Sequence, residues 1–421
     1  MSTAQQLHGQ WWAADAADRT VYGVFTLGDD AEPRLDLGSE LLGFSRDSVT
    51  VHGSSGGRAV SIFGAYVTTE SGIVRNGEDH RRQTVEGAGV VIGPNHVADK
   101  SALAFAEAVV ELDYLTFWTA EFDPTISHPP GGKISFTVPD PLPRTASYGA
   151  VEVTVGSYSS YSGRSRFTRD DMTLPGRFKN IISVSSVELL SVDDHLAISR
   201  RLSDLVTIAM RRPAGVRAIT FHETVGSSGI SDRYEWWSAD DLPEENTALD
   251  ERSRRRINFR LSDVDDVEQL LGRWNELHTG AFYGVASLVA QLRETTTFYE
   301  TRLLGVCGTL EALHRGLYPD PKKVDYRQRC AALAAIPPEA ARALVIPDID
   351  EWAGHLTKAR NHLAHGDEPT ERTVPEDIWY GLHERTVALL VLVMMTKLGI
   401  SEHVQVKALN SGALRSATNQ I

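Results

Sequence analysis

Hydrophobic residues repeat with two different periods along this chain, and the change of period limits the folds available to it. From about Thr20 to Glu223, short β-branched runs are separated by Gly, Pro, Asn and Asp. Period-two runs between such turn residues are typical of antiparallel strands. One segment, Ser191 to Met210, instead has the spacing of an amphipathic helix. Its apolar stripe contains Leu196, Ile198, Leu202, Leu205 and Ile208.

A charged segment, Ser238 to Arg256, separates these strands from the rest of the chain. It contains few apolar residues, which is typical of an exposed linker. Beyond it, Ser262 precedes an acidic turn and is predicted to cap a helix. Further helices are predicted at about 280–295, 297–316, 324–335, 350–365 and 375–398.

The predicted fold class is an α+β multidomain chain, in which a β-rich N-terminal region precedes an all-α helical bundle. A chain of 421 residues is longer than one hydrophobic core normally serves, so more than one domain is expected. We place the β-rich region, of one or two subdomains, at 1–238, the charged linker at 239–257, the bundle at 258–404 and a polar tail at 405–421.

Composition argues against several other classes of protein. The first residues lack the basic start and apolar run of a secretory signal. The longest apolar run, Val387 to Met395, is far shorter than the roughly 20 residues of a membrane span. Cys307 and Cys330 provide neither a disulfide framework nor a metal-ligand spacing, so a cytoplasmic protein without membrane contact is expected. Because the net charge is −14, any nucleic-acid site must be a local cluster of Lys or Arg.

One pattern of chemically active residue types, R-x-x-x-x-H, occurs four times. With 34 Arg and 14 His among 421 residues, about one match is expected by chance, so the spacing alone has little value. Three copies lie in unsuitable contexts. Arg75 lies in a Gly- and acid-rich loop, residues 217–222 form a predicted strand, and Arg273 is followed by Glu276, which would neutralise its charge.

The fourth copy, residues 360–365 (RNHLAH), lies on a predicted helix. At roughly 100° per residue, Asn361 and His365 are about 40° apart and point away from the apolar stripe, with Arg360 on its flank. This trio is therefore expected to face outward. The stripe itself consists of Trp352, Leu356, Ala359 and Leu363.

The residue types of this trio suit the cleavage of RNA. Gly366 and Pro369 are helix stop signals, so His365 is expected in the last turn. The helix dipole favours imidazolium there and moves the histidine pKa toward neutrality, where the ring can both take and give protons. Arg360 offers planar donors for phosphate oxygens. Transesterification of RNA needs a base for the 2′-hydroxyl, an acid for the leaving 5′-oxygen and a cation beside phosphorus.

Two other interpretations of this region remain open. Arg360 and His365 are equally well explained as solvated residues at a helix end. Alternatively, His355, His362 and His365 share part of one helix face and could bind a metal ion, although no partner carboxylate is evident.

The segment KARNHLAHGD (358–367) resembles the signature of the ApeA-like branch of HEPN ribonucleases, R-N-x-x-x-H in a small helical bundle. It follows a helix that ends in LEALHRG (310–316), and residues 9–27 (GQWWAADAADRTVYGVFTL) resemble the start of the N-terminal domain found with that branch. The resemblance implies a HEPN endoribonuclease that acts in bacterial anti-phage defence by abortive infection. Its catalytic positions would be Arg360, Asn361 and His365. No metal or other cofactor is expected, because the proposed chemistry uses the adjacent 2′-hydroxyl and no metal-activated water.

Glu311 and His362 are candidate supporting residues. Glu311 lies where related bundles often keep a polar residue near the site, although a solvated glutamate on an amphipathic helix explains it as well. His362 occupies a variable position of the signature, so the resemblance gives it no role.

The expected partners are an RNA substrate, with tRNA as one candidate, a phage-derived trigger, and a second copy of the chain in a homodimer or higher oligomer. A two-fold axis would supply the reaction with two histidines, one as acid and one as base. Apolar residues of the 378–398 helix, including the run from Val387, are candidates for the contact. Residues 1 to about 240 are expected to regulate cleavage and to contribute none of its chemistry. The alternative function is a sensor or scaffold that binds nucleic acid or nucleotide without cutting it.

Overall fold

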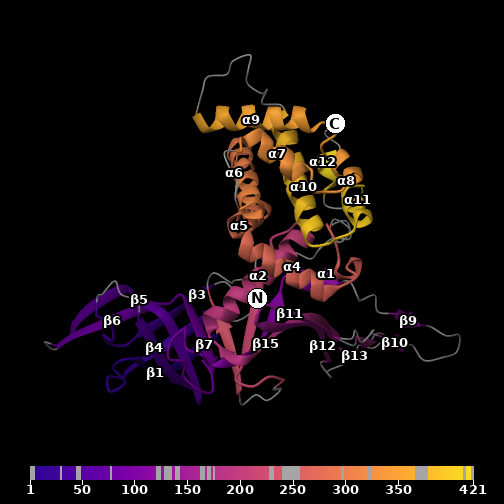
Figure 1. Ribbon diagram of the computed structural model, residues 1–421. Coiled ribbons are helices and arrows are strands. Elements are labelled where there is room, and N and C mark those ends of the chain that lie inside the picture. Colours follow the sequence, from indigo (N-terminus) through magenta and orange to yellow (C-terminus); the bar gives the residue numbers. More distant parts are fainter. Residues whose placement is uncertain are drawn as a thin grey trace.

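The computed structural model confirms the predicted fold class, because a β-rich N-terminal region precedes a helical C-terminal region (Figure 1). Among the described helices, none combines the length and the apolar character that a membrane span requires. For His365, the structure describes the backbone but not the side chain. The described residues are 5–28, 31–43, 49–75, 78–119, 125–127, 135–137, 143–161, 166–167, 172–173, 176–226, 232–238, 257–294, 298–319, 324–365, 378–410 and 414–418.

Most of the described strands form one antiparallel sheet, in the order β11-β12-β15-β8-β16-β17-β7-β5-β4-β1-β2-β3-β6. The strands are β1 (Gln5–Ala13), β2 (Val21–Gly28), β3 (Ala31–Leu37), β4 (Val49–Ser55), β5 (Arg58–Arg75), β6 (Glu78–Glu86), β7 (Gly89–Gly93), β8 (Phe105–Leu112), β9 (Thr125–Ser127), β10 (Ser135–Thr137), β11 (Arg144–Tyr148), β12 (Val151–Tyr161), β13 (Arg166–Phe167), β14 (Met172–Thr173), β15 (Gly176–Leu190), β16 (Val216–His222) and β17 (Arg233–Trp237).

One end of this sheet closes on itself. The strands β5, β4, β1, β2, β3 and β6 form a ring, because β6 pairs with β3 on one side and with β5 on the other. Every second residue of β1 and β2 turns toward the inside of the ring. Trp11, Phe25 and Ile62 belong to its hydrophobic core. The period-two pattern of the sequence is thus confirmed in this part of the chain.

The segment around Arg75 differs from the prediction of a loop. β5 continues to Arg75 and β6 begins at Glu78, with Arg75 opposite Glu78 and Ile73 opposite His80. β-branched residues on both strands, which favour extended pairing, explain the long hairpin. Only residues 76–77 separate the strands, and they lie outside the described residues.

The helices predicted from periodicity are confirmed as α2, α5, α6, α7, α9 and α10. The helix expected after Ser262 begins later, because Asp266 is its cap: the Asp266 carboxylate accepts from the backbone N–H of Gln269 at 2.9 Å. Ser262 lies in a 3₁₀ turn. The helices are α1 (Leu115–Thr119), α2 (Val192–Met210), α4 (Val267–Gly280), α5 (Phe282–Arg293), α6 (Tyr299–Leu317), α7 (Tyr326–Ala334), α8 (Glu339–Ala343), α9 (Ile349–His365), α10 (Trp379–Lys397), α11 (Glu402–Asn410) and α12 (Arg415–Thr418).

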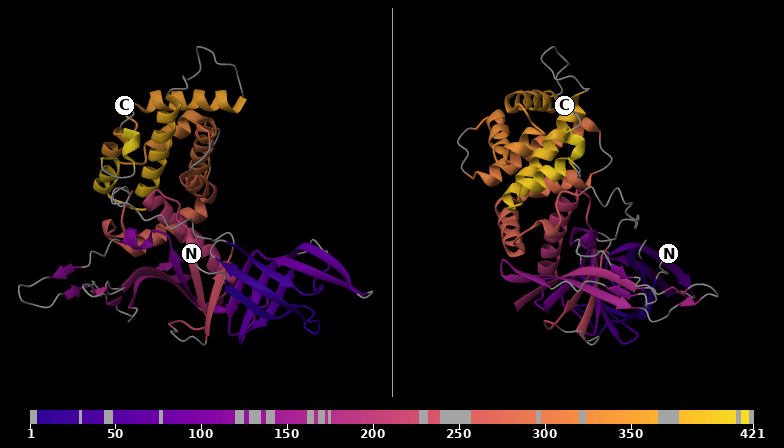
Figure 2. Two further views of the ribbon diagram at one scale, coloured as in Figure 1. Left: turned by 180° about the vertical axis from the view of Figure 1, so that it is seen from behind. Right: turned by 90° about the vertical axis from the view of Figure 1, so that its right-hand side faces the viewer.

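Helix α2 joins the sheet to the helical bundle, as Figures 1 and 2 show. Ser191 begins it with a capping box, and Leu205 to Met210 are buried all round because they pack between the two layers. A second hydrophobic core therefore contains residues from strands beyond the ring, from α2 and from the helical bundle. Phe221, Leu205 and Leu288 belong to this core. The boundary between the two hydrophobic cores therefore lies within the β-rich region. The proposed linker at 239–257 lies outside the described residues except for Ile257, and that boundary stays a prediction.

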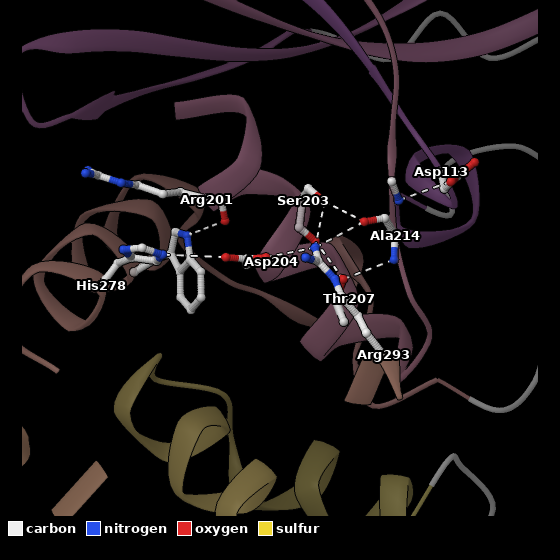
Figure 3. A network of polar contacts seen from close by, with 10 residues as sticks. Asp113, Arg201, Ser203, Asp204, Thr207, Ala214, His278 and Arg293 are labelled. Atoms are coloured by element: carbon white, nitrogen blue, oxygen red, sulfur yellow. Dashed lines mark hydrogen bonds and ion pairs between the residues drawn. The ribbon is translucent and has the colours of Figure 1, made fainter. Parts of the chain in front are cut away.

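Hydrogen bonds and ion pairs also connect α2 with the bundle (Figure 3). Asp204 pairs with Arg293 of α5 at 2.8 Å and lies 3.6 Å from Nε2 of His278 in α4. The indole N–H of Trp274 donates to the carbonyl oxygen of Arg201 at 3.0 Å. One helix of the N-terminal region thus contacts two helices of the C-terminal region directly.

Two expectations about the C-terminal part are wrong. Residues 405–421 were expected to form a polar tail, but α11 extends into this segment and α12 lies within it, because Leu409 and Leu414 provide apolar contacts and are fully buried. The apolar run from Val387 to Met395 is buried in the chain's own core. That run cannot serve as the contact between two copies, because the bundle itself covers it.

Candidate active site at the end of helix α9

Helix α9 carries the R-N-x-x-x-H motif on its last turns. Its apolar stripe is confirmed, since Leu356 and Ala359 are fully buried. The indole N–H of Trp352 donates to the hydroxyl of Thr386 in α10 at 3.2 Å. The helix ends at His365, as the stop signals predict. Packing against neighbouring helices therefore fixes α9, and the motif lies at its end.

Arg360 lies on the flank of the stripe, and its side chain is 35% exposed. Three groups surround its guanidinium. Nη2 lies 3.5 Å from a carboxylate oxygen of Glu311 in α6, Nη1 donates to Oδ1 of Asn361 at 3.3 Å, and Cζ lies 5.0 Å from the ring centroid of Tyr326 in α7. The guanidinium is thus held by groups from three helices while part of it faces solvent.

The structure brings Glu311, a candidate supporting residue, to Arg360. The same carboxylate also pairs with Arg315, one turn further along α6, at 2.7 Å. One carboxylate therefore interacts with two guanidinium groups, and positive charge exceeds negative charge within this set of three residues. An anionic ligand such as phosphate fits such a set.

The other motif residues are placed differently. Asn361 is exposed beside Arg360, as predicted from the helical angle. His362 is partly buried, and its ring centroid lies 6.0 Å from that of Trp379 in α10. It therefore contacts α10, and the structure does not bring it together with Arg360. The backbone of His365 lies one turn beyond Asn361, on the same side of α9.

The groups beneath Arg360 are kept neutral. The phenol of Tyr326 donates to the carbonyl oxygen of Cys307 at 3.3 Å, and burial raises the pKa of this phenol well above its ordinary value. Burial also raises the pKa of the Cys307 thiol to about 11 and that of Cys330 further above its ordinary value. Neither cysteine is therefore a thiolate nucleophile at neutral pH.

The other R-x-x-x-x-H copies have structural contacts of their own. Arg217 of β16 pairs with Asp113, which lies between β8 and α1. His278 is buried beside Asp204 and packs against Trp274, with 5.5 Å between ring centroids. Such contacts fix strands and helices, so these copies are poor candidates for catalysis.

The described side chains contain no group of three or more His, Cys, Asp or Glu that could hold a metal ion. The side chain of His365 lies outside the described part of the structure, so the three-histidine interpretation stays a prediction.

The sequence gives no sign of one neighbour of the motif, Tyr326. It is the first residue of a helix whose own pattern is weakly amphipathic, and its contact with Arg360 joins segments more than thirty residues apart. An aromatic residue at a helix start is not a signal by itself. The contact is visible only once α6, α7 and α9 are packed together.

Comparison with known families covers most of the chain. The model of the ApeA N-terminal domain 1 matches residues 6–274, and the model of the Apea-like HEPN domain matches residues 304–404. No curated protein and no solved structure matches the chain. The second match contains α9 with the whole motif, most of α6 and all of α10. The chain therefore belongs to the family of ApeA-like HEPN proteins, with an ApeA N-terminal domain in front of a HEPN domain.

Proposed function

We propose that this chain is a metal-independent endoribonuclease that cleaves RNA by attack of a 2′-hydroxyl on the adjacent phosphate. The main support is the position of the Arg360 guanidinium, because groups from three helices hold it beside Asn361 near the end of α9. A cation with planar donors stabilises the charge of a pentavalent phosphate most effectively when the cation is already oriented and does not have to move during the reaction.

The roles follow from the chemistry of each group. Arg360 binds the phosphate and stabilises its developing charge. His365 takes the proton of the 2′-hydroxyl or gives one to the leaving 5′-oxygen, because an imidazole can act as a base and as an acid near neutral pH. Asn361 orients Arg360 through its amide oxygen, and its amide N–H groups can reach the same phosphate.

Analysis of the RNA products tests this mechanism. The protein should cut RNA in the presence of EDTA and leave 2′,3′-cyclic phosphate ends, because the nucleophile is the adjacent hydroxyl and no metal-activated water takes part. Loss of cleavage in EDTA and its return with zinc or manganese would instead support a metal site that includes His355, His362 and His365.

The active species of this proposal is a homodimer or higher oligomer. One motif contains one catalytic histidine, and a two-fold axis beside the ends of two α9 helices would bring an acid and a base to one phosphate. Light scattering of the purified chain tests this. A species of 46.2 kDa that still cleaves RNA would contradict it.

The proposed biological role is defence of a bacterium against phage by abortive infection, with cellular RNA as the substrate and tRNA as one candidate. The N-terminal region would restrain the bundle until it binds a phage component. Its route to the bundle is α2, which contacts α4, α5 and α10. The role requires that cells carrying the wild-type chain limit phage growth and that cells carrying His365→Ala do not.

A further inference from the structure

The ring of Tyr326 is held in place before any ligand binds. Asp325 begins α7 with a capping box: its carboxylate accepts from the backbone N–H of Gln328 at 2.8 Å, and the Gln328 amide oxygen accepts from the N–H of Asp325 at 3.1 Å. The phenol of Tyr326 is bound to the Cys307 carbonyl in α6. Both ends of the aromatic side chain are therefore fixed.

This ring acts on Arg360 in a way that Glu311 cannot. A carboxylate attracts a guanidinium by binding its N–H donors, which a phosphate would then have to displace. A ring face attracts the cation through its π electrons and uses none of the N–H groups. The contact at 5.0 Å therefore limits the motion of the guanidinium and leaves its donors for a phosphate.

We propose that Tyr326 is a positioning residue, which holds the guanidinium of Arg360 in the orientation that receives the phosphate. The proposal rests on the proposed function, and it extends the site to a third helix. The phenolic hydroxyl orients the ring, whereas the ring face acts on Arg360. Aromatic character at position 326 should consequently matter more than size or the hydroxyl.

A set of full-length variants separates these contributions. Tyr326→Phe keeps the ring and removes the hydroxyl, while Tyr326→Met fills similar volume without a ring. Tyr380→Met is the matched control, because Tyr380 lies in the same bundle with its ring 5.3 Å from that of Tyr299. Thermal unfolding of each variant shows whether the bundle is intact.

The first measurement is the steady-state cleavage of an RNA oligonucleotide. Tyr326→Met should lower kcat by about tenfold with little change in KM, because an orienting contact acts mainly in the transition state. Tyr326→Phe should restore most of the lost kcat, and Tyr380→Met should match the wild type. Equal losses in Tyr326→Phe and Tyr326→Met would overturn the proposal, since they would trace the effect to the hydroxyl.

The second measurement does not depend on activity. In the full chain labelled at arginine, the Nε–Hε resonance of Arg360 should be shifted by the ring current and ordered in the wild type and in Tyr326→Phe. In Tyr326→Met it should move to the random-coil position and become mobile. An unchanged resonance in Tyr326→Met overturns the positioning role. The expected resonances in a protein that cleaves no RNA would instead uphold the contact and reject the proposed function.

Discussion

Replacement of Arg360 by alanine is expected to slow RNA cleavage by about 100-fold or more while the chain remains folded. The change removes the cation that faces the phosphate. It should not disturb the bundle, because Arg360 is only partly buried and Glu311 keeps its shorter pair with Arg315. Steady-state cleavage and thermal unfolding of the purified variant measure the two effects separately.

Two further variants make this prediction specific. Arg360→Lys should recover only a small part of the rate, because an ammonium group lacks the planar fork that binds two phosphate oxygens. Arg75→Ala is the matched control, because residues 75–80 (RNGEDH) have the same R-N-x-x-x-H spacing and Arg75 ends β5. This variant should cleave at the wild-type rate. If Arg360→Ala and Arg75→Ala behave alike, the motif in α9 has been assigned wrongly.

Replacement of Arg211 by alanine should lower the free energy of unfolding by about 3 kcal/mol or more. Arg211, at the end of α2, pairs with Glu384 of α10 at 2.9 Å, and their side chains are only 16% and 8% exposed. Ser416 of α12 also donates to Glu384. Removal of the arginine leaves a buried carboxylate without its main cationic partner. Urea unfolding of the full chain measures the loss.

An exposed ion pair provides the control. Arg34 and Asp36 in β3 lie 2.8 Å apart, but their side chains are 54% and 48% exposed, so Arg34→Ala should change the free energy of unfolding by less than about 1 kcal/mol. Equal effects of Arg34→Ala and Arg211→Ala would show that the contact between α2 and α10 contributes little to stability.

The Glu384 carboxylate should also make stability depend on pH. Burial would raise its pKa, but hydrogen bonds from His383 and Ser416 and the charge of Arg211 together lower it from 4.5 to about 2. A carboxylate with a lowered pKa stabilises the fold above its unfolded value and loses this contribution as the pH falls toward its folded value. Wild-type stability should therefore fall between about pH 4.5 and pH 2, and Glu384→Gln should make this fall shallower.

Local sequence signals predicted much of the helical architecture. The bounds of α9 follow from its apolar stripe and from the stop signals after His365, both of which act within one helix. The bounds of α2 follow from its apolar stripe in the same way, and the structure shows that Ser191, the first residue of the predicted segment, caps this helix. At the start of α4, two acceptable caps lie four residues apart; Asp266 caps the helix, whereas Ser262 lies in a 3₁₀ turn.

Features that depend on tertiary packing cannot be predicted from such local signals. The run from Val387 to Met395 is apolar on all sides of a helix, which is equally consistent with a subunit contact and with a fully enclosed helix. In the structure, α6, α9 and α12 pack around α10, so the run belongs to an enclosed helix. The pairing of Arg360 with Glu311 and Tyr326 likewise depends on three helices that no sequence spacing relates.

We propose that residues 360–365 form a catalytic site for RNA cleavage. The most direct measurement compares the purified full-length wild type with His365→Ala and His80→Ala on total RNA. We expect equal cleavage by the wild type and His80→Ala, and cleavage slowed by about 100-fold or more in His365→Ala. Binding of RNA without cleavage by the wild type would favour a non-catalytic sensor. Cleavage by His365→Ala at the wild-type rate would show that residues 360–365 are not the catalytic site.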